Sequence, residues 1–513
     1  MARFFGLRGS RLNYAAILGV VMPTMMSMGY NQGLLGGVLT LPWFEFQFPE
    51  IDVTHAQPSE KQYTSTLQGT VVALYAAGGF LGAMSCIGLG DVLGRRRTII
   101  LASVVQMIGA FLMASSFSFA QLIVSRVFLG LGTGGQLATV PIWQSEISPA
   151  SKRGAHVGTT GIFVSTGLTL GLLVDLGMSY VANSASWRVP VGLPIILCLT
   201  VMIFTSQMPE SPRWLIQQGQ VSAAREVLAA LRDTEMDSEM IKKEILDVEA
   251  SLAIAGKGSL RQVFQMGHQR ICHRASLAAG GLILLQLTGV NSITFYSTTI
   301  FQSHLHLEPT TSKILAVIYQ FSGIFGGIVC VSTIESFGRR VLLLSSATAN
   351  TICMVLVAAL SSQSTNNIAM HAAVVFMFIF HFSMIIGFGG IPFLYASEMS
   401  PLSLRTTING ISSGMYWALS VLIAEVTPIA FNAIGWKYFL IFACLNFAMI
   451  PIVYVFFPET AGLSLEDIDE VFIMSTSWLD PVRMAKKLPE KLNGREVQED
   501  RPLEKNGDGA LKA

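Results

Sequence analysis

The hydrophobic positions of this chain gather into twelve long runs separated by polar segments. Each run holds about 20 mainly apolar residues, the length that an α-helix needs to cross the hydrocarbon core of a membrane. Pro392 falls within the tenth run and is expected to interrupt the hydrogen-bond ladder of that helix. The pattern predicts an all-α membrane protein with transmembrane helices at residues 14–41, 68–88, 98–116, 121–143, 155–181, 189–207, 275–302, 312–334, 341–361, 368–396, 407–433 and 437–457.

Composition excludes a soluble fold. Of the 513 residues, 51% are hydrophobic and 13% are charged, whereas soluble domains are about 25% charged. The formal net charge is +1 and no basic patch is present, so neither a nucleic acid nor another polyanion is expected as a partner. Arg3, Arg8 and Arg11 precede an apolar stretch too long for a signal-peptide core, so the first helix is expected to remain as an anchor.

The positive residues orient the predicted helices, because Lys and Arg near helix ends tend to stay in the cytoplasm. Placing both termini inside leaves 28 of the 33 Lys and Arg residues inside, four outside (Lys61, Arg188, Lys313 and Lys437) and one, Arg126, within a helix. The predicted organisation is a cytoplasmic N-terminus (1–13), a six-helix half (14–207), a cytoplasmic helical linker (208–274), a second six-helix half (275–457) and a cytoplasmic C-terminus (458–513) that is flexible after about residue 474.

Three short motifs occur twice and in the same order. GDVLGRRR (90–97) returns as ESFGRR (335–340), SEISPASKR (145–153) as SEMSPLSLR (397–405), and PESPR (209–213) as PET (458–460), at offsets of 244, 252 and 249 residues. This recurrence indicates an internal duplication, with charges at the cytoplasmic ends of the second, fourth and sixth helices of each half. Parallel repeats of this kind are one way in which transporters are built, with a substrate site between the halves near the bilayer midplane.

Together with GYNQG (29–33), QLTGVNSITFY (286–296) and PETAGLSLEDID (458–469), these motifs resemble the sugar porter family of the major facilitator superfamily, and most of all its fungal members. The resemblance implies alternating access, with the repeated charges as a cytoplasmic gate that is closed when the protein faces outward. The alternative is that these charges only set the topology. The gate residues expected are Asp91, Arg95, Arg96, Arg97, Glu146, Arg153, Glu210, Arg213, Glu335, Arg339, Arg340, Glu398, Arg405 and Glu459.

The resemblance also implies a substrate site, because family members hold a sugar by amide and aromatic side chains. Some family positions have lost polar groups: Leu285 replaces one of two adjacent glutamines, Gly161 replaces a glutamine of the fifth helix, and Phe393 replaces a tryptophan. In the eleventh helix an asparagine pair becomes Tyr416 and Ser420. A less hydroxylated polyol, a sugar derivative or a fungal metabolite therefore stays open beside a sugar. The substrate residues expected are Asn31, Gln286, Asn291, Tyr296, Phe393 and Trp417, with hydrogen bonding between helices as the alternative role of Gln286 and Asn291.

Asn31 bears on energy coupling. Proton-coupled members of the resembled family commonly carry Asp at this position, whereas facilitators carry Asn, and an amide cannot carry a proton. We therefore expect facilitated diffusion of a sugar-like solute. The alternatives are a proton-coupled sugar or polyol symporter, an exporter of a fungal metabolite and a non-transporting nutrient sensor. Ionisable residues that fall well inside the predicted helices include Arg126, Asp175, Glu425 and His381, of which His381 is expected to hydrogen-bond to a neighbouring helix.

The sequence carries no pattern of an enzyme. No nucleophile, metal cluster or phosphate loop stands out, so neither a cofactor nor a metal is expected. GLGTGG (130–135) resembles a glycine-rich loop but falls inside a predicted membrane helix, without the strand that a nucleotide site needs. The expected partners are a small solute and the lipid bilayer, and the expected location is the plasma membrane.

Overall fold

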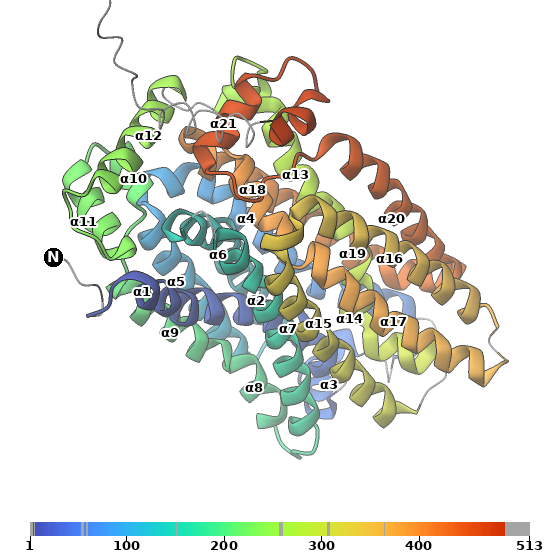
Figure 1. Ribbon diagram of the computed structural model, residues 1–513. Coiled ribbons are helices and arrows are strands. Elements are labelled where there is room, and N and C mark those ends of the chain that lie inside the picture. The colour runs from blue at the N-terminus through green and yellow to red at the C-terminus, as the bar shows by residue number, and fades with distance from the viewer. Residues whose placement is uncertain are drawn as a thin grey trace, which may run out of the picture.

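The chain folds into a bundle of helices (Figure 1). The computed structural model describes residues 4, 6–39, 41–52, 56–57, 60–149, 152–255, 260–304, 308–363 and 365–487. Every named element in these ranges is a helix, which confirms the predicted fold class.

The main helices of the two halves follow one another in a similar order. In the first half these are α1 (Gly9–Ala16), α2 (Met22–Val38), α4 (Lys61–Leu93), α5 (Arg95–Ala114), α6 (Phe119–Ile147), α7 (Arg153–Met178), α8 (Ala185–Gly192) and α9 (Pro194–Gln207), with a π-helical segment at Ile17–Val21 and a short α3 (Pro42–Gln47). In the second half they are α13 (Ile271–Leu287), α14 (Val290–Thr299), α15 (Pro309–Phe337), α16 (Arg339–Ser361), α17 (Asn367–Phe388), α18 (Ile391–Met399), α19 (Arg405–Ile434) and α20 (Lys437–Phe456).

Eleven stretches of the described chain are long and apolar enough to cross a membrane. They correspond to eleven of the twelve predicted runs. The remaining run, 121–143, lies in α6, which has 29 residues and is therefore also long enough at about 1.5 Å per residue. Its polar Thr133 and Gln136 are buried in a helix that packs between α4 and α5. Much of α6 is therefore covered by protein rather than lipid, which accounts for its lower hydropathy.

Two helices of the second half are broken near their middle. The break between α13 and α14 falls at Gly289, whose φ of 89° is in the left-handed region that favours glycine. The break between α17 and α18 falls at Gly389 and Gly390, with Pro392 near the start of α18. The interruption expected at Pro392 is therefore confirmed. Broken membrane helices are found where the freed backbone faces protein or a cavity.

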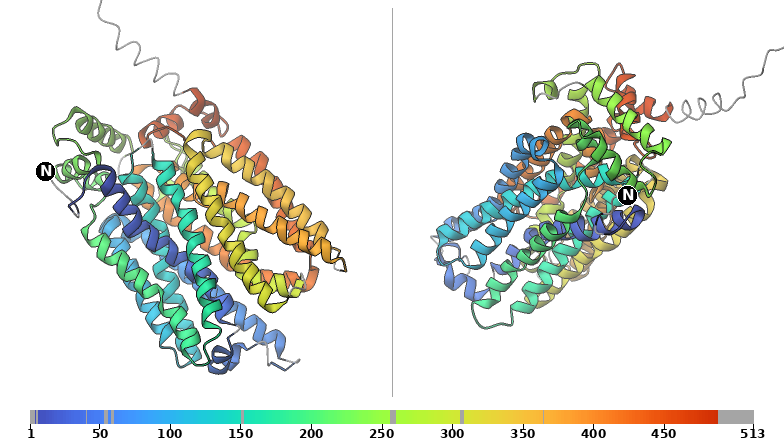
Figure 2. Two further views of the ribbon diagram at one scale, coloured as in Figure 1. Left: turned by 60° about the horizontal axis from the view of Figure 1, so that its bottom comes forward. Right: turned by 90° about the vertical axis from the view of Figure 1, so that its left-hand side faces the viewer.

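The two halves form neighbouring bundles (Figure 2). Helices α7 and α15 pack against each other across the boundary, as do α4 and α19. Within the first half, α2 and α7 approach closely at Gly29, where a Cβ atom would lie 2.0 Å from the Val164 carbonyl oxygen. A glycine at this position therefore lets the two backbones touch.

One end of the bundle carries additional short helices (Figures 1 and 2). These are α10 (Pro212–Gln217), α11 (Val221–Arg232) and α12 (Glu239–Ala255) between the halves, and α21 (Leu465–Ile473) after α20. We call this the linker end, and the opposite one the far end.

Order extends beyond residue 474, where a flexible tail was expected to begin. Residues 480–487 are helical, Arg270 donates a hydrogen bond to the Ser475 carbonyl oxygen at 3.2 Å, and the rings of His273 and Trp478 lie 4.1 Å apart. These contacts fasten the segment to the start of α13. The rest of the predicted tail, 488–513, lies outside the described residues.

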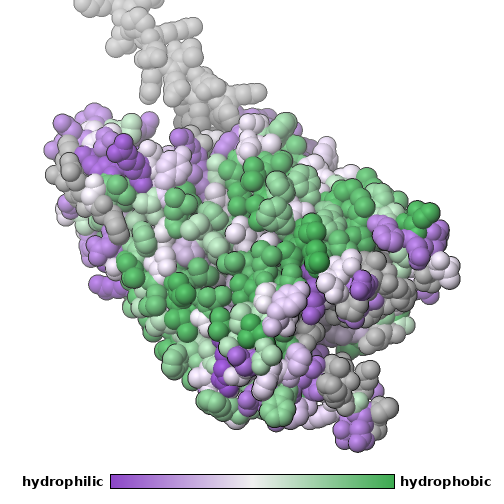
Figure 3. Space-filling view, turned by 90° about the horizontal axis from the view of Figure 1, so that it is seen from below, coloured by the Kyte–Doolittle hydropathy of each residue, from purple (hydrophilic) through white to green (hydrophobic). Residues whose placement is uncertain are grey.

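The surface is consistent with a membrane environment. In Figure 3, hydrophobic side chains cover the broad middle of the visible face, and hydrophilic ones gather toward its edges. Exposed residues include Phe111 at 64%, Ile203 at 61% and Phe447 at 65% of their surface. Large apolar side chains exposed in such numbers indicate contact with lipid.

Candidate functional site

A small cavity lies between the two halves, with a volume of about 50 Å³. Helices α2 and α7 of the first half border it, together with helices of the second half. Both broken helices reach it, since Val290 follows the first break and Gly389 forms the second. Its polar lining residues are Gln32, Ser165, Asn291, Thr294, His381 and Tyr416, and the others are Met28, Val164, Leu168, Leu285, Val290, Met384, Ile385, Gly389 and Phe393.

The polar residues of the cavity form a hydrogen-bond chain across the two halves. The Gln32 amide of α2 donates to the Tyr416 hydroxyl of α19 at 3.1 Å. The Asn291 amide donates to Gln286 Oε1 at 2.6 Å, and Gln286 in turn donates to the Tyr416 carbonyl oxygen at 2.9 Å. This chain holds amide and hydroxyl groups at the edge of the cavity, where they can exchange partners with the hydroxyls of a solute.

Only two of the six predicted substrate residues, Asn291 and Phe393, line the cavity. Gln286 lies behind Asn291 as its hydrogen-bond acceptor. Trp417 is buried and packs edge-on against Tyr75 of α4, with ring centroids 5.5 Å apart. The structure therefore brings Asn291 and Phe393 together with Gln286 and places Trp417 in the packing between α4 and α19.

Asn31 and Tyr296 are not among the residues that line the cavity. The Asn31 amide donates to the Ser27 carbonyl oxygen of its own helix at 2.7 Å. The Tyr296 hydroxyl donates to the Ala424 carbonyl oxygen at 2.8 Å. In this conformation both residues therefore hydrogen-bond to backbone.

The ionisable residues His381 and Arg126 hydrogen-bond to neighbouring helices. His381 Nδ1 lies 2.9 Å from the Tyr319 carbonyl oxygen, and the two rings stack at 4.3 Å, as expected for a histidine bonded to a neighbouring helix. Arg126 donates to the carbonyl oxygens of Val71 and Val72 at 3.3 and 3.2 Å. Its guanidinium also lies over the Tyr75 ring, 5.0 Å from the centroid, so Arg126 ties α6 to α4.

The predicted gate residues of the first half meet at the linker end. Arg95 pairs with Glu146 at 3.2 Å and with Asp91 at 3.3 Å. The Glu210 carboxylate accepts hydrogen bonds from the backbone N–H groups of Arg95 and Arg96, each at 3.1 Å. It thus caps the start of α5, where the helix dipole favours a negative charge.

The second half repeats this arrangement. Arg339 pairs with Glu398 at 3.3 Å and with Glu335 at 2.9 Å. The Glu459 carboxylate accepts hydrogen bonds from the backbone N–H groups of Arg339 and Arg340, at 2.9 and 3.0 Å. The two halves therefore repeat not only the motifs but also the arrangement of the side chains in them.

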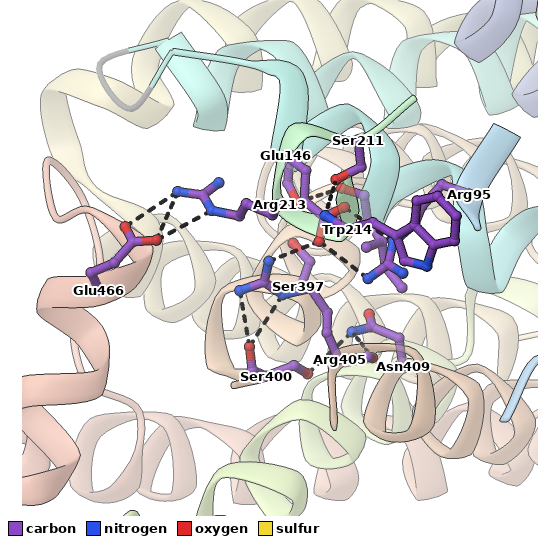
Figure 4. Close-up of polar contacts among 12 residues, drawn as sticks. Arg95, Glu146, Ser211, Arg213, Trp214, Ser397, Ser400, Arg405, Asn409 and Glu466 are labelled. Carbon is purple, nitrogen blue, oxygen red and sulfur yellow. Dashed lines mark hydrogen bonds and ion pairs between the residues drawn. The ribbon is translucent and has the colours of Figure 1, made fainter. Parts of the chain in front are cut away.

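Several polar contacts at the linker end join the chain before α13 to the chain after it. Arg405 pairs with Glu146 at 2.9 Å, and the Ala155 N–H donates to Glu335 Oε1 at 3.0 Å. Arg213 pairs with Glu466 of α21 at 3.0 Å. Figure 4 shows Arg405 and Arg95 reaching Glu146 from two sides, and Arg213 reaching Glu466. The linker end is closed in this conformation.

Several predicted gate residues form no side-chain ion pair among the described residues: Arg96 and Arg340 donate to backbone carbonyls, Glu210 and Glu459 accept from backbone N–H groups, and Arg97 and Arg153 form none. Arg153 is buried, and its Nε and Nη1 atoms have no hydrogen-bond partner among the described residues. Arg97 is exposed. Among the described residues, the duplicated clusters therefore contribute one ion pair between the halves, that of Arg405 with Glu146, whereas its repeat partner Arg153 forms none.

Burial and charge act in opposite directions on the carboxylates outside the membrane helices. Burial raises the pKa of Glu210, although hydrogen bonds from Ser211, Arg95 and Arg96 oppose it. Burial alone would also raise the pKa of Glu466, but the Arg213 guanidinium overcomes this and holds the pKa below its usual value. Glu466 therefore remains charged and paired near neutral pH.

Comparison with known proteins identifies the family. The model of the sugar (and other) transporter family matches residues 16–472. The chain is 32% identical over 510 residues to the sugar transporter STL1 of Saccharomyces cerevisiae, covering 96% of this chain and 87% of that protein. It is 32% identical over 508 residues to the MFS-type transporter oryC of Aspergillus oryzae, covering 97% and 92%. The chain belongs to the sugar transporter family.

The solved structures agree with this assignment at the level of the fold. The structure of the proton:xylose symporter XylE, a major facilitator superfamily protein, superposes with a TM-score of 0.79 at 19% identity, covering 90% of this chain and 100% of that one. As a sugar transporter family member, the protein is a multi-pass membrane transporter and not an enzyme, as the sequence predicted.

Sequence reasoning missed three contributors to this transporter's sites. Gln32 lines the cavity, but only its neighbour Asn31 was expected there. Thr460 donates to Glu398 Oε2 at 2.7 Å, and Glu466 pairs with Arg213. Glu466 lies within the motif PETAGLSLEDID, so its acidic residues were the available signal. For Gln32 no signal existed, because α2 is buried on almost every side and shows no outward face.

Proposed function

We propose that this transporter moves a sugar or a related polyol across the membrane by facilitated diffusion, with the central cavity as its solute site. The name of the relative STL1, a sugar transporter, supports a sugar-like solute. The cavity chemistry supports it too, because Gln32, Asn291 and Tyr416 offer amide and hydroxyl groups within mostly apolar walls. Such a lining suits a molecule with several hydroxyls on a carbon frame.

The cavity is contracted in this conformation. Its volume of about 50 Å³ is far below the ~300–1,000 Å³ of ordinary ligand pockets. The Gln32 to Tyr416 hydrogen bond spans the site between the halves, so solute entry requires the halves to separate there. The solute's own hydroxyls would then replace this bond.

The linker end is the cytoplasmic gate in this proposal. Its buried pair between Arg405 and Glu146 keeps that end closed, and breaking the pair opens the cavity inward. Both termini and the helical linker (208–274) lie in the cytoplasm, since this orientation keeps most Lys and Arg residues inside. The plasma membrane is the proposed location.

The proposal of facilitated diffusion rests on Asn31. An amide cannot carry a proton, and the Asn31 amide donates to the Ser27 carbonyl oxygen rather than to another helix. Coupling to one proton at 100 mV would supply about 2.3 kcal/mol from the electrical term alone, which corresponds to roughly fiftyfold accumulation. A facilitator stops at equal concentrations.

The test is uptake from a panel of radiolabelled hexoses, pentoses and polyols in transporter-deficient cells, followed by vesicle measurements with the best substrate. We expect the inside-to-outside ratio of a non-metabolised substrate to settle near one, with or without an uncoupler. Uncoupler-sensitive accumulation would refute facilitated diffusion, and absence of flux for the whole panel would refute the solute class. Asn291→Ala should weaken affinity, whereas Asn350→Ala serves as the matched control, because Asn350 is a buried amide between α16 and α17 that does not line the cavity.

A further inference from the structure

A carboxylate without a partner lies toward the far end, on α7. Asp175 is only 5% exposed, and neither of its oxygens has a hydrogen-bond partner among the described residues. A cavity of about 30 Å³ adjoins it, with Gly36 and Gly37 of α2, Thr298 of α14 and Lys313 of α15 in its lining. Burying a carboxylate without a partner is unfavourable, so a second conformation that pairs this acid would be stabilised.

Lys313 is the complementary charge. It lies near the start of α15 and is half-buried. It also lines a larger cavity of about 340 Å³, which shares Leu41, Leu176 and Ser179 with the smaller one. Among the residues that line these two cavities, Lys313 is the only cation and Asp175 the only anion.

The same two helices carry a polar contact at the linker end. There the Ala155 N–H of α7 donates to Glu335 of α15 at 3.0 Å. Asp175 follows Ala155 by 20 residues and Lys313 precedes Glu335 by 22, which is about 30 Å along each helix. The two pairs therefore lie at opposite ends of one antiparallel helix pair, and roughly one membrane thickness separates them.

Between the two pairs the helices are in direct contact. Near the middle of the pair, a Cβ atom at Gly323 of α15 would lie 2.7 Å from the Ser165 hydroxyl oxygen of α7. Such a close midpoint contact suits a pivot, because the ends of the helices can tilt while the middle stays packed. In this conformation the linker-end contact is formed, and no ion pair joins the two far-end side chains within the 4.0 Å limit of such a pair.

We propose that Asp175 and Lys313 form an ion pair that closes the far end when the linker end opens. The inference rests on the proposed function, because it requires alternating access. In the present conformation the linker-end pairs are formed, and the Asp175 carboxylate has neither a hydrogen bond nor an ion pair within 4.0 Å among the described residues. Tilting α7 against α15 breaks the contact of Ala155 with Glu335 and brings the Lys313 ammonium to the Asp175 carboxylate. The two ends thus stabilise opposite states of the cycle.

The experiment measures exposure of the far end in the absence of solute. A cysteine introduced by Ser179→Cys, in a full-length variant without the six native cysteines, is labelled from outside with a membrane-impermeant maleimide. Asp175→Asn and Lys313→Gln should each raise the labelling rate about fivefold or more, the lower end of typical coupling between sites. Glu146→Gln should lower it, because it weakens the opposite end.

Matched controls come from other charges expected at the far end. Glu425→Gln and Lys437→Gln should leave the labelling rate unchanged. The exchanged pair Asp175→Lys with Lys313→Asp should return the rate toward that of the parent. The proposal is overturned if both single variants label at the parental rate or if the exchanged pair shows no recovery.

A third outcome would also overturn the proposal. If Asp175→Asn abolished an uncoupler-sensitive accumulation while Lys313→Gln changed nothing, Asp175 would be a proton site instead of half of an ion pair. Because labelling needs no solute, a failure here is distinct from a failure of the proposed solute class.

Discussion

The charge clusters of the two halves have the same local geometry but different partners. In each half, one buried arginine bridges two carboxylates and a third carboxylate caps the helix that the arginine begins. Glu146 of the first half adds Arg405 of the second. Glu398, its repeat partner, adds the Thr460 hydroxyl from its own half. The cluster within each half is therefore repeated, whereas only the Arg405–Glu146 pair, and not its Arg153–Glu398 counterpart, forms an ion pair between the halves among the described residues.

Contacts within a half and contacts between halves have different roles, although the repeated motifs in the sequence do not distinguish them. A contact within a half stabilises that half in every state of the cycle. A contact between halves stabilises only the state in which they meet at that end. Glu146 forms an ion pair within its half and another to the second half, whereas Glu398 meets the first half only through a longer-range attraction to Arg153. Substitutions at the two positions should therefore differ strongly in their effect on the contact between halves.

The largest effect is expected for Glu146→Gln compared with Glu398→Gln. Each change removes one partner of a buried pair, which destabilises by about 3–5 kcal/mol, so both should lower the unfolding temperature in detergent. Glu146→Gln should also favour the inward-open state, and Glu398→Gln should do so much less. A loss of about 2 kcal/mol from the contact between halves corresponds to roughly a thirtyfold shift in population. Labelling of the cytoplasmic side measures this shift, and equal shifts for both variants would contradict this difference between the two carboxylates.

A second comparison concerns the repeated arginines. Arg405→Gln removes a charge-assisted hydrogen bond to Glu146, worth about 1.5–3 kcal/mol, and should shift the population about tenfold or more toward inward-open. Arg153→Gln should shift it little, because the Arg153 guanidinium forms no ion pair among the described residues. The same cytoplasmic labelling assay compares them. A larger effect of Arg153→Gln would mean that this arginine pairs in the outward-facing state.

The sequence predicted the positions of these charges because the motifs recur at nearly constant offsets. Arg95 and Arg339, like Glu146 and Glu398, could be matched in this way. The partners across the halves could not be predicted, since Arg153 and Arg405 are equivalent by sequence. The two arginines differ in their surroundings. Arg213 lies near both of them, and it pairs with Glu466. This pair has no counterpart in the other half, because the residue equivalent to Arg213 there is Gly462.

The central cavity shows a second limit of sequence reasoning. Asn31 and Gln32 are adjacent, so about 100° of helix rotation decides which of them faces the cavity. Along a lipid-facing helix, hydrophobic periodicity indicates this rotation. Helix α2 is buried along most of its length, so the pattern carries no such indication. The twelve helices could therefore be predicted, whereas the faces they turn to the solute depend on packing.

A smaller effect is expected where Glu398 contacts its own half. Thr460→Val removes the hydroxyl that donates to Glu398 at 2.7 Å while keeping the shape of the side chain. The loss should be about 1 kcal/mol of stability, seen as a modest fall in unfolding temperature. Because this contact lies within one half, the inward to outward population should not change. A population shift would show that Thr460 acts on the gate.

The smallest effect is expected for the pair of Arg213 and Glu466, which is partly exposed, with 22% of the Glu466 side chain accessible. Such a pair contributes up to about 1 kcal/mol, reduced further by solvent screening. Arg213 holds the folded-state pKa of Glu466 below its usual value despite burial. The contribution is therefore present above the unfolded-state pKa of about 4.3 and is lost as the pH falls through the lower folded-state value.

Thermal unfolding of the parent and of Glu466→Gln in detergent, from pH 7 to pH 3, tests this sign. The parent should have a slightly higher unfolding temperature than Glu466→Gln at pH 7. This difference in unfolding temperature should shrink below about pH 4.3, as the Glu466 carboxylate takes up its proton. All other titrating groups are common to both proteins, so the difference isolates Glu466. If the difference in unfolding temperature stayed constant or grew on acidification, Glu466 would stabilise the linker contact by packing and not by its charge.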